Sequence, residues 1–420
     1  MSILSILFRM LFMLAFYFLP DLFIRSGIKT AFPKKSRKAL RIYWIFNIII
    51  LLIAFSGLIL NRNLENEFIR INLYMFGIFV AFLFTKILVA AFLFGEDIFR
   101  VPISIYKRWI KKEKPEEGEK SLISRRKFLS RSVLVFAALP FGGFIYGMVK
   151  GRYNFTIHKE TLFFNDLPEA FDGITITQLS DLHIGSWDHF AKNQMEYAVQ
   201  QVNMLQSDII CFTGDIVNSR SDEMNGWFDV FKKMEAPLAK ISILGNHDYG
   251  DYVNWETEED KKQNLDEVKN IHPQIGFELL LNEKKTIERN GQFLHFAGIE
   301  NWGSGDFPKL GDLNKAAEGL TDKDFIILLS HDPTFWETHA IPHSSKPNIT
   351  LSGHTHGFQM GIEIPGFRFS PAQFIYKQWA GLYQIGTQYI YVNRGLGTVG
   401  YPGRLGIWPE ITQLTLRRKI

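Results

Sequence analysis

Residues 42–60 form the longest stretch of the chain without a charged side chain, and they are almost entirely apolar. A helix needs about 20 apolar residues to cross the hydrocarbon core of a bilayer. Core helices of soluble proteins are usually amphipathic, whereas this stretch has no polar face. It therefore predicts a membrane-spanning helix.

Three further apolar stretches lie in the same part of the sequence, at residues 3–24, 71–94 and 133–149. Together with 42–60 they predict about four transmembrane helices within a membrane region at residues 1–150. Lys86 interrupts one of them, and we expect its long side chain to reach the interface rather than to mark a transport path.

The loops between these stretches differ in charge, and this difference predicts an orientation. Basic residues fill the first loop (Arg25, Lys29, Lys34, Lys35, Arg37, Lys38, Arg41) and the third (Arg100, Lys107, Arg108, Lys111, Lys112, Lys114, Lys120, Arg125, Arg126, Lys127, Arg131). In the second loop, Arg62 and Arg70 are balanced by Glu65 and Glu67. Because basic loops stay cytoplasmic, we expect a multi-pass protein of the cytoplasmic (inner) membrane whose residues after 150 are extracytoplasmic.

Residues 124–129, Ser-Arg-Arg-Lys-Phe-Leu, precede an apolar stretch and resemble a bacterial twin-arginine export signal. The two arginines are equally well explained as cytoplasmic charges beside a helix. In either case no clean cleavage site follows, so we expect an uncleaved anchor.

Composition excludes several other classes. The chain is 15% aromatic and only 21% charged, which is unlike a disordered protein. Cys211 is the only cysteine, so a disulfide scaffold is excluded. A net charge of +4 from 47 basic and 43 acidic residues does not indicate nucleic-acid binding.

Residues 151–420 contain short β-rich runs that alternate, in their first half, with helical stretches at Asp188–Leu205 and Asn225–Met234. This pattern predicts an α/β domain. The expected strands are Gly173–Leu179, Asp208–Phe212, Lys240–Leu244, Phe293–Ile299, Phe325–Leu329, Ile349–Leu351, Tyr389–Val392 and Ile411–Leu416.

Polar motifs follow five of these strands. They are Asp181-Leu182-His183, Gly214-Asp215, Gly245-Asn246-His247-Asp248, Ser330-His331-Asp332 and Gly353-His354-Thr355-His356. Functional side chains of α/β sheets gather beyond the carboxyl ends of strands, so we expect these residues to converge. The remaining histidines are interpreted as structural or surface residues: His158, His189, His272, His295, His339 and His343.

The motifs supply more ligands than one ion needs, and none of them is a thiolate. Oxygen donors are Asp181, Asp215 and Asn246, and imidazoles are His183, His331, His354 and His356. This mixture suits Mn, Fe or Zn in a catalytic site. Two divalent ions sharing one carboxylate would use all seven ligands, hold a bridging hydroxide and clamp a phosphate.

The motifs D-x-H, G-D, G-N-H-D, H and G-H-T-H, in this order, resemble the calcineurin-like metallophosphoesterase superfamily. The resemblance implies a four-layer α/β sandwich with a dinuclear metal centre. Asp181, His183 and His356 would bind the first metal, Asn246, His331 and His354 the second, and Asp215 would bridge them. His247 would take the catalytic role of stabilising the phosphoryl oxygen or protonating the leaving group, and Asp248 would orient its ring.

The C-terminal part, around Gly381-Leu382-Tyr383 and Val392–Thr398, resembles the membrane-associated bacterial branch that includes a twin-arginine-exported, wall-associated phosphoesterase. That branch often has Gly-Gly-Gln after G-H-T-H, where this chain has Gly357-Phe358-Gln359. Phe358 departs from the pattern at the expected substrate entrance. Arg394 is equally consistent with a phosphate contact and with a structural role.

These observations favour a membrane-anchored phosphoesterase that hydrolyses phosphomono- or phosphodiesters by attack of a metal-bridging hydroxide. Its expected partners are a lipid- or wall-linked phosphoester and membrane lipid, with no nucleic acid. One alternative is a UDP-lipid pyrophosphatase of the same fold, which would need a cytoplasmic domain. Another is a membrane sensor that binds metal without turnover.

Overall fold

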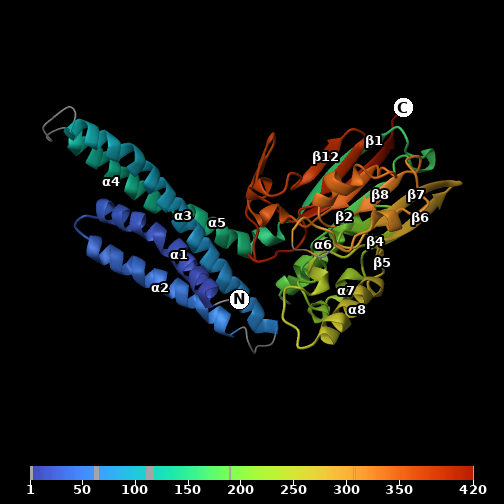
Figure 1. The fold of residues 1–420 in the computed structure, drawn as a ribbon, viewed down its shortest axis with the longest axis horizontal. Coiled ribbons are helices and arrows are strands. Elements are labelled where there is room, and N and C mark those ends of the chain that lie inside the picture. Colours follow the sequence, from blue (N-terminus) through green and yellow to red (C-terminus); the bar gives the residue numbers. More distant parts are fainter. Residues whose placement is uncertain are drawn as a thin grey trace. The chain divides into compact units, whose positions relative to one another are not determined.

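The computed structural model describes residues 3–60, 66–109, 118–188, 191–305, 307 and 309–419 (Figure 1). The chain divides into two compact units, Met1–Met148 and Val149–Ile420. The first unit is helical, and the second contains all the strands of the described chain.

The first unit, here called the membrane unit, consists of α1 (Ile3–Ala31), α2 (Ser36–Leu60), α3 (Asn66–Trp109), α4 (Gly118–Phe136) and α5 (Ala138–Val149). Within the described residues, the stretches Ile71–Arg100 and Arg126–Tyr153 are long and apolar enough to cross a membrane. They contain the predicted spans 71–94 and 133–149. The predicted spans 3–24 and 42–60 lie within α1 and α2 and stay predictions.

Lys86 does not reach an interface, so the expectation drawn from its sequence position is wrong. Its side chain is buried, and its Nζ lies 3.0 Å from a carboxylate oxygen of Asp21 on α1. Nζ also donates to the carbonyl oxygen of Tyr17, 2.9 Å away. Asp21 accepts further hydrogen bonds from Tyr43 and Asn47 on α2. A buried ammonium is tolerated where a carboxylate compensates it, and this pair joins α1 to α3.

Arg126 of the twin-arginine-like motif lies in α4 and makes contacts inside the membrane unit. Its guanidinium donates to Ser26 of α1 at 2.8 Å and lies 3.3 Å from the carboxylate of Asp97 in α3. These contacts give Arg126 a structural role that joins three helices. Whether the motif also acts as an export signal stays a prediction.

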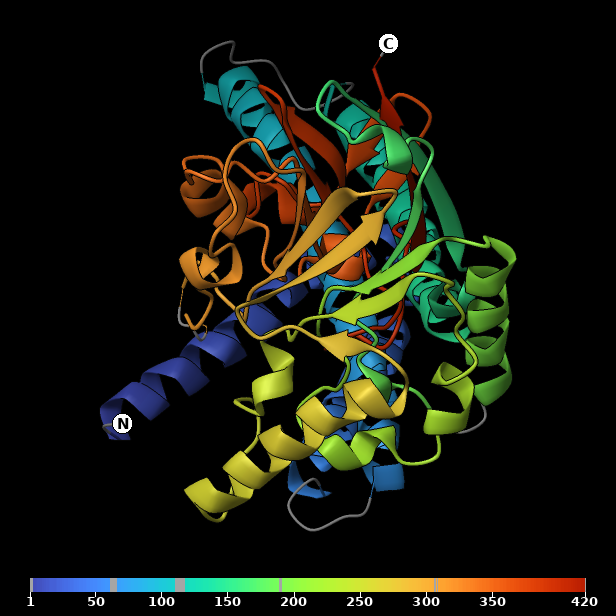
Figure 2. The same cartoon turned by 90° about the vertical axis from the view of Figure 1, so that its right-hand side faces the viewer.

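The second unit, here called the catalytic unit, contains two six-stranded sheets. Sheet A has the order β1 (Thr156–Phe164), β14 (Glu410–Arg418), β2 (Thr175–Leu179), β3 (Ile209–Phe212), β4 (Ala239–Ser242) and β5 (Glu278–Leu279). Sheet B has the order β12 (Gly381–Ile385), β13 (Gln388–Val392), β9 (Ile349–Ser352), β8 (Ile326–Leu329), β7 (Gln292–Gly298) and β6 (Glu283–Arg289). The antiparallel neighbours β6 and β7 are the golden strands of Figure 2.

Strands β2 to β5 run parallel in sheet A, and β7, β8, β9 and β13 run parallel in sheet B. Parallel strands buried on both faces are nearly continuous apolar runs, as in Ile326–Leu329. Because their carboxyl ends lie at one edge of each sheet, the loops that follow them share one end of the unit.

Three apolar clusters account for the layers. One lies between the sheets and includes Ile176, Phe296 and Leu414. A second packs sheet A against α6 (Lys192–Met204), α7 (Phe228–Phe231) and α8 (Glu258–Gln274), which lie together in Figure 1. A third covers the other face of sheet B and includes Leu313 of α9 (Leu313–Ala316). This is the expected four-layer α/β sandwich preceded by a helical membrane region.

All eight predicted strands are present, with ends shifted by one or two residues. Asn225–Met234 was expected to be helical but contains only the single turn α7, flanked by hydrogen-bonded turns. The sequence interpretation missed α8 and the strands β1, β5, β6 and β12. It also missed the hairpin of β10 (Ile362–Ile364) and β11 (Phe367–Phe369).

Candidate metal centre

The predicted ligands come from the carboxyl ends of five parallel strands. Asp181 and His183 follow β2, Asp215 follows β3, and Asn246 follows β4, all in sheet A. His331 follows β8, and His354 and His356 follow β9, in sheet B. Donors from the two sheets lie close together, and His354 is the most exposed of the seven residues.

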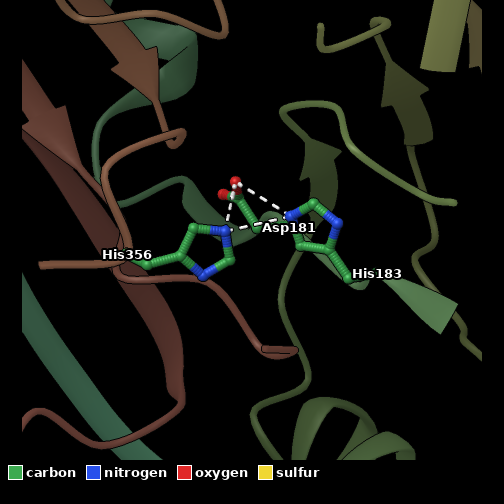
Figure 3. A group of neighbouring side chains, drawn as sticks. All are labelled: Asp181, His183 and His356. Atoms are coloured by element: carbon green, nitrogen blue, oxygen red, sulfur yellow. Dashed lines mark hydrogen bonds and ion pairs between the residues drawn. The ribbon is translucent and has the colours of Figure 1, made fainter. Parts of the chain in front are cut away.

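One group of donors consists of Asp181, His183 and His356 (Figure 3). The Nε2 atom of His356 lies 3.2 Å from Oδ1 of Asp181 and 3.0 Å from Nε2 of His183. All three side chains are buried. Three buried donor atoms this close together form a group that could hold a metal ion.

A second group surrounds the Oδ1 atom of Asn246. Oδ1 lies 3.1 Å from Nε2 of His331 and 2.8 Å from Nδ1 of His354. Asp215 joins the two groups, because its Oδ2 is 3.1 Å from Nε2 of His331 and 3.5 Å from Nε2 of His183. The carboxylate of Asp215 is thus shared between both groups of donors.

The backbone at these positions is unusual. Asp181, His183, Asp215, His354 and His356 all have positive φ, between 44° and 70°. Few residues other than glycine adopt this region, and each such residue costs about 1–3 kcal/mol. Five left-handed residues among seven donors indicate that the loops are shaped to point side chains inward at the expense of stability.

Burial and charge set the protonation of these groups. Burial raises the pKa of Asp181, but the neighbouring His356 outweighs it and holds that pKa below its usual range. Burial lowers the pKa of His331, but the carboxylate of Asp215 raises it to about 10. Burial is also the largest cause that lowers the pKa values of His183, His354 and His356. Neutral imidazole is the form that binds metals.

His247 lies beside these donors, and its ring is held by a carbonyl group. Its Nδ1 is 2.7 Å from the backbone oxygen of Asn218, and its ring stacks on Tyr252 with 4.1 Å between centroids. A carbonyl oxygen only accepts, so Nδ1 carries the proton and Nε2 is left to exchange one.

Asp248 was expected to orient this ring, and that expectation is wrong. Its two carboxylate oxygens accept hydrogen bonds from the backbone N–H groups of Gly245, Asp215, Ile216 and Val217. Burial and the charge of Asp215 raise the pKa of Asp248 to about 7. Asp248 therefore fastens the loops of Asp215 and Asn246 to each other and positions the donors indirectly.

Sequence interpretation missed Asn218, which orients two histidines. Its Oδ1 lies 3.1 Å from Nδ1 of His183, and its backbone oxygen holds His247. A hydrogen bond at Nδ1 leaves the Nε2 lone pair of His183 directed at Asp215 and His356. The one available signal in the sequence was its position three residues after Asp215, in the loop that follows an apolar strand.

Three other side chains at the site were also missed. Tyr252 accepts from Nδ2 of Asn246 at 2.7 Å, which turns the amide oxygen toward the histidines. The hydroxyl of Tyr376 lies 3.0 Å from Nε2 of His354. Nη2 of the buried Arg404 lies 3.2 Å from Nδ1 of His356, and its charge helps to lower the pKa of that ring.

Arg394 has a structural role. Its guanidinium is buried and forms ion pairs with Glu410 and Glu363. Both pairs engage the terminal nitrogens that a phosphate would need. The phosphate contact that the sequence left open is thus not supported.

The donors fit divalent cations. Carboxylate, amide oxygen and neutral imidazole are ligands of Mn, Fe and Zn. Asp215 lies close to both groups of donors, which is the position of a bridging ligand. Stacked α/β sheets with these donors at their strand ends define a metal-binding sandwich domain.

Comparison with known families supports a more specific assignment. Residues 174–358 match the family model described as calcineurin-like phosphoesterase. Residues 5–152 match a model described as "Probable Calcineurin-like phosphoesterase, transmembrane domain". The chain belongs to the calcineurin-like metallophosphoesterase family, whose members use divalent metals, and it carries an N-terminal transmembrane domain.

The chain is similar to several curated proteins. It is 31% identical over 303 residues to an uncharacterized metallophosphoesterase, YkuE, of Bacillus subtilis, covering 70% of this chain and 98% of that protein. It is 28% identical over 320 residues to a transmembrane protein with metallophosphoesterase domain from Danio rerio, covering 70% and 67%. It is 25% identical over 305 residues to the phosphodiesterase YaeI of Escherichia coli, covering 70% and 100%.

Proposed function

We propose that this protein is a membrane-anchored phosphoesterase that uses two divalent metal ions to hydrolyse phosphomono- or phosphodiesters. The observation that carries the proposal is the position of Asp215 between two groups of donors, 3.1 Å from His331 and 3.5 Å from His183. A sensor that binds metal without turnover would not need His247 beside these donors with its Nε2 free for proton exchange.

Asp181, His183 and His356 would hold the first ion, and Asn246, His331 and His354 the second, with Asp215 between them. When bound, two such ions supply an activated water and neutralise charge on the phosphoryl oxygens. With both ring nitrogens protonated, His247 would donate from Nε2 to a phosphoryl oxygen or to the leaving group. Asn218, Tyr252 and Arg404 would keep the ligand rings and the amide oriented.

Asp215→Asn tests the bridging assignment on the full-length protein purified in detergent and loaded with Mn²⁺. An amide has one oxygen in place of two and no charge, so we expect kcat/KM for a model phosphodiester to fall at least about 1,000-fold. Metal content, measured by elemental analysis, should also fall. Asp229→Asn, which changes an exposed carboxylate paired with Lys192, is the control. Wild-type activity in Asp215→Asn would contradict the assignment.

We also propose that the catalytic unit lies outside the cytoplasmic membrane, which the charges of the loops support. Reporters that are active on only one side of the membrane, fused after residue 150, test this. An active cytoplasmic reporter would contradict the proposal and would favour the pyrophosphatase alternative. Phosphatase and phosphodiesterase assays with the same preparation would separate mono- from diesterase activity.

A further inference from the structure

The hairpin of β10 and β11 has an apolar face that is exposed. Ile362 pairs with Phe369 and Ile364 with Phe367, so these four side chains lie on one face of the two-stranded ribbon. Their exposed fractions are 53%, 36%, 58% and 53% in the same order. Exposed side chains of this size on one face are rare unless a partner covers them.

The polar residues of the hairpin face the other way, onto the catalytic unit. Glu363 forms an ion pair of 2.6 Å with the buried Arg394. The guanidinium of Arg368 lies over the rings of Trp379 and Tyr383, 5.1 and 5.5 Å from their centroids. These contacts fix the orientation of the ribbon. The apolar face is therefore held outward by the fold and does not result from a loosely attached loop.

The apolar surface continues onto neighbouring segments. Phe374 and Ile375 are exposed by 77% and 66%, and Phe358 by 41%. The rings of Phe369 and Phe374 are in edge-to-face contact, with 6.3 Å between centroids. We call this surface the apolar rim, and it consists of Phe358, Ile362, Ile364, Phe367, Phe369, Phe374 and Ile375.

The rim adjoins the candidate metal centre at two points. Phe358 comes two residues after the ligand His356 and has positive φ, where the related pattern has glycine. Tyr376 comes directly after Ile375, and its hydroxyl contacts His354 at 3.0 Å. A molecule whose phosphate reached the metal donors would therefore have its apolar part near the rim.

The partner that is always available to this rim is a lipid bilayer. A stretch fit to cross the membrane ends at Tyr153, and strand β1 of the catalytic unit begins at Thr156. So short a tether keeps the catalytic unit at high effective concentration near lipid. The rim combines Phe and Ile side chains without a charged member, which is the composition of surfaces that insert among acyl chains.

We propose that the apolar rim inserts into the acyl region of the membrane that anchors the chain. The substrate would then be a phosphoester in the headgroup of a membrane lipid, whose acyl chains stay in the bilayer during hydrolysis. The substrate assignment rests on the proposed function, whereas insertion of the rim into the membrane does not.

Insertion can be measured without any enzymatic activity. The only native cysteine, Cys211, is buried, so a single introduced cysteine can be labelled in the full-length protein. We would attach an environment-sensitive fluorophore to Ile364→Cys and, as control, to Phe163→Cys, which is 54% exposed on β1. In phosphatidylcholine nanodiscs with spin-labelled lipid, we expect at least about threefold stronger quenching at 364 than at 163. Equal quenching would overturn the proposal.

The substrate class is tested with the double variant Ile364→Ser/Phe367→Ser in the same nanodiscs. We expect its KM for a headgroup phosphodiester lipid to rise about tenfold or more, with the rate on a soluble nitrophenyl phosphodiester unchanged within twofold. Phe163→Ser/Phe293→Ser, at similarly exposed positions, should change neither value. An equal loss on both substrates would overturn the lipid assignment. Lack of turnover of both substrates by metal-loaded wild-type protein would refute the proposed function, while the quenching result would still decide insertion.

Discussion

His247 lies close to the candidate metal donors, and two hydrogen bonds fix its position. Its backbone N–H donates to Oδ1 of Asp215 at 2.9 Å, and its Nδ1 is engaged by Asn218. Both contacts fix the position of the residue beside Asp215, and neither of them uses Nε2.

We predict that His247→Ala lowers kcat by about 100-fold or more, because general acid catalysis contributes about 10²–10⁴-fold. Metal content should stay near that of the wild type, since the seven donors are intact. Elemental analysis and steady-state kinetics on the same sample would check both statements. A loss of metal equal to the loss of rate would instead make His247 a ligand.

The seven donors could be predicted from the sequence because each follows an apolar strand, and strand ends of parallel sheets converge. Asn218 and Arg404 could not, because their roles depend on contacts with His183, His247 and His356 that no local pattern encodes. Asp248 was misassigned for a related reason. Because Asp248 follows His247 in the sequence, a contact between their side chains was expected. In the structure the turn directs the carboxylate of Asp248 toward backbone N–H groups such as that of Asp215.

At the scale of elements, the turn after β4 is packed too closely for any side chain at Gly245. A Cβ atom there would lie 2.2 Å from Oδ1 of Asp215 and 2.7 Å from Cε1 of His331. The backbone of Gly245 is not among those with positive φ, so crowding alone requires the glycine.

Gly245→Ala should therefore displace Asp215 and lower the metal content while the domain stays folded. Gly386→Ala is the matched control, since position 386 lies in open space at a positive φ and the substitution costs about 1–2 kcal/mol through the backbone alone. Metal content and the melting temperature would be measured for both variants. Full metal occupancy in Gly245→Ala would contradict the packing argument.

Helix α8 contains His272, which is fully buried, and neither ring nitrogen has a hydrogen-bond partner in the described part of the chain. Burial lowers its pKa to about 3. The folded state therefore binds this proton less readily than the unfolded chain, whose histidine has a pKa near 6.5. The contribution of His272 to the free energy of unfolding is fully present above pH 6.5 and is lost as the pH drops toward 3.

At pH 4.5 this loss amounts to about 3 kcal/mol. We predict that His272→Leu, which keeps an apolar side chain of similar size, reduces the fall in melting temperature between pH 7 and pH 4.5. Thermal unfolding of both proteins in the same detergent and buffers would check this. Parallel pH profiles would show that His272 does not contribute.

The strands that the sequence predicted are the central, apolar ones, such as β3 and β8. The missed strands β1 and β6 lie at sheet edges and contain charged residues, which make up five of the seven residues of Glu283–Arg289. An edge strand is stabilised by one neighbour and by solvent on its other side, so its sequence needs little apolar character. Local sequence therefore carries less information about the edge strands of a sheet than about its central strands.

At the scale of the whole molecule, the membrane unit depends on an ion pair away from water. Asp21 and Lys86 are each buried, and Tyr43 and Asn47 complete the hydrogen bonds of the carboxylate. Removing one charge leaves the other without compensation. The pair thus specifies how α1 and α3 align.

We predict that Lys86→Met destabilises the protein by about 3–5 kcal/mol. Asp21→Asn removes the remaining charge and keeps an acceptor for Tyr43, so the double variant Lys86→Met/Asp21→Asn should regain most of that loss. Thermal unfolding in detergent of the wild type, both single variants and the double variant gives the coupling energy. A double variant as unstable as the sum of the singles would contradict a specific pair.

Strand β14 also has a consequence for the order of events during synthesis. It is the last strand in the described part of the chain, yet it pairs with β1 on one side and β2 on the other. Until the ribosome has released residues 410–418, β1 lacks its neighbour and β2 has an open edge, both ready to pair with other chains. Insertion of the membrane helices therefore precedes completion of the sheet. The nascent catalytic unit must be protected, on whichever side it is delivered, until its closing strand arrives.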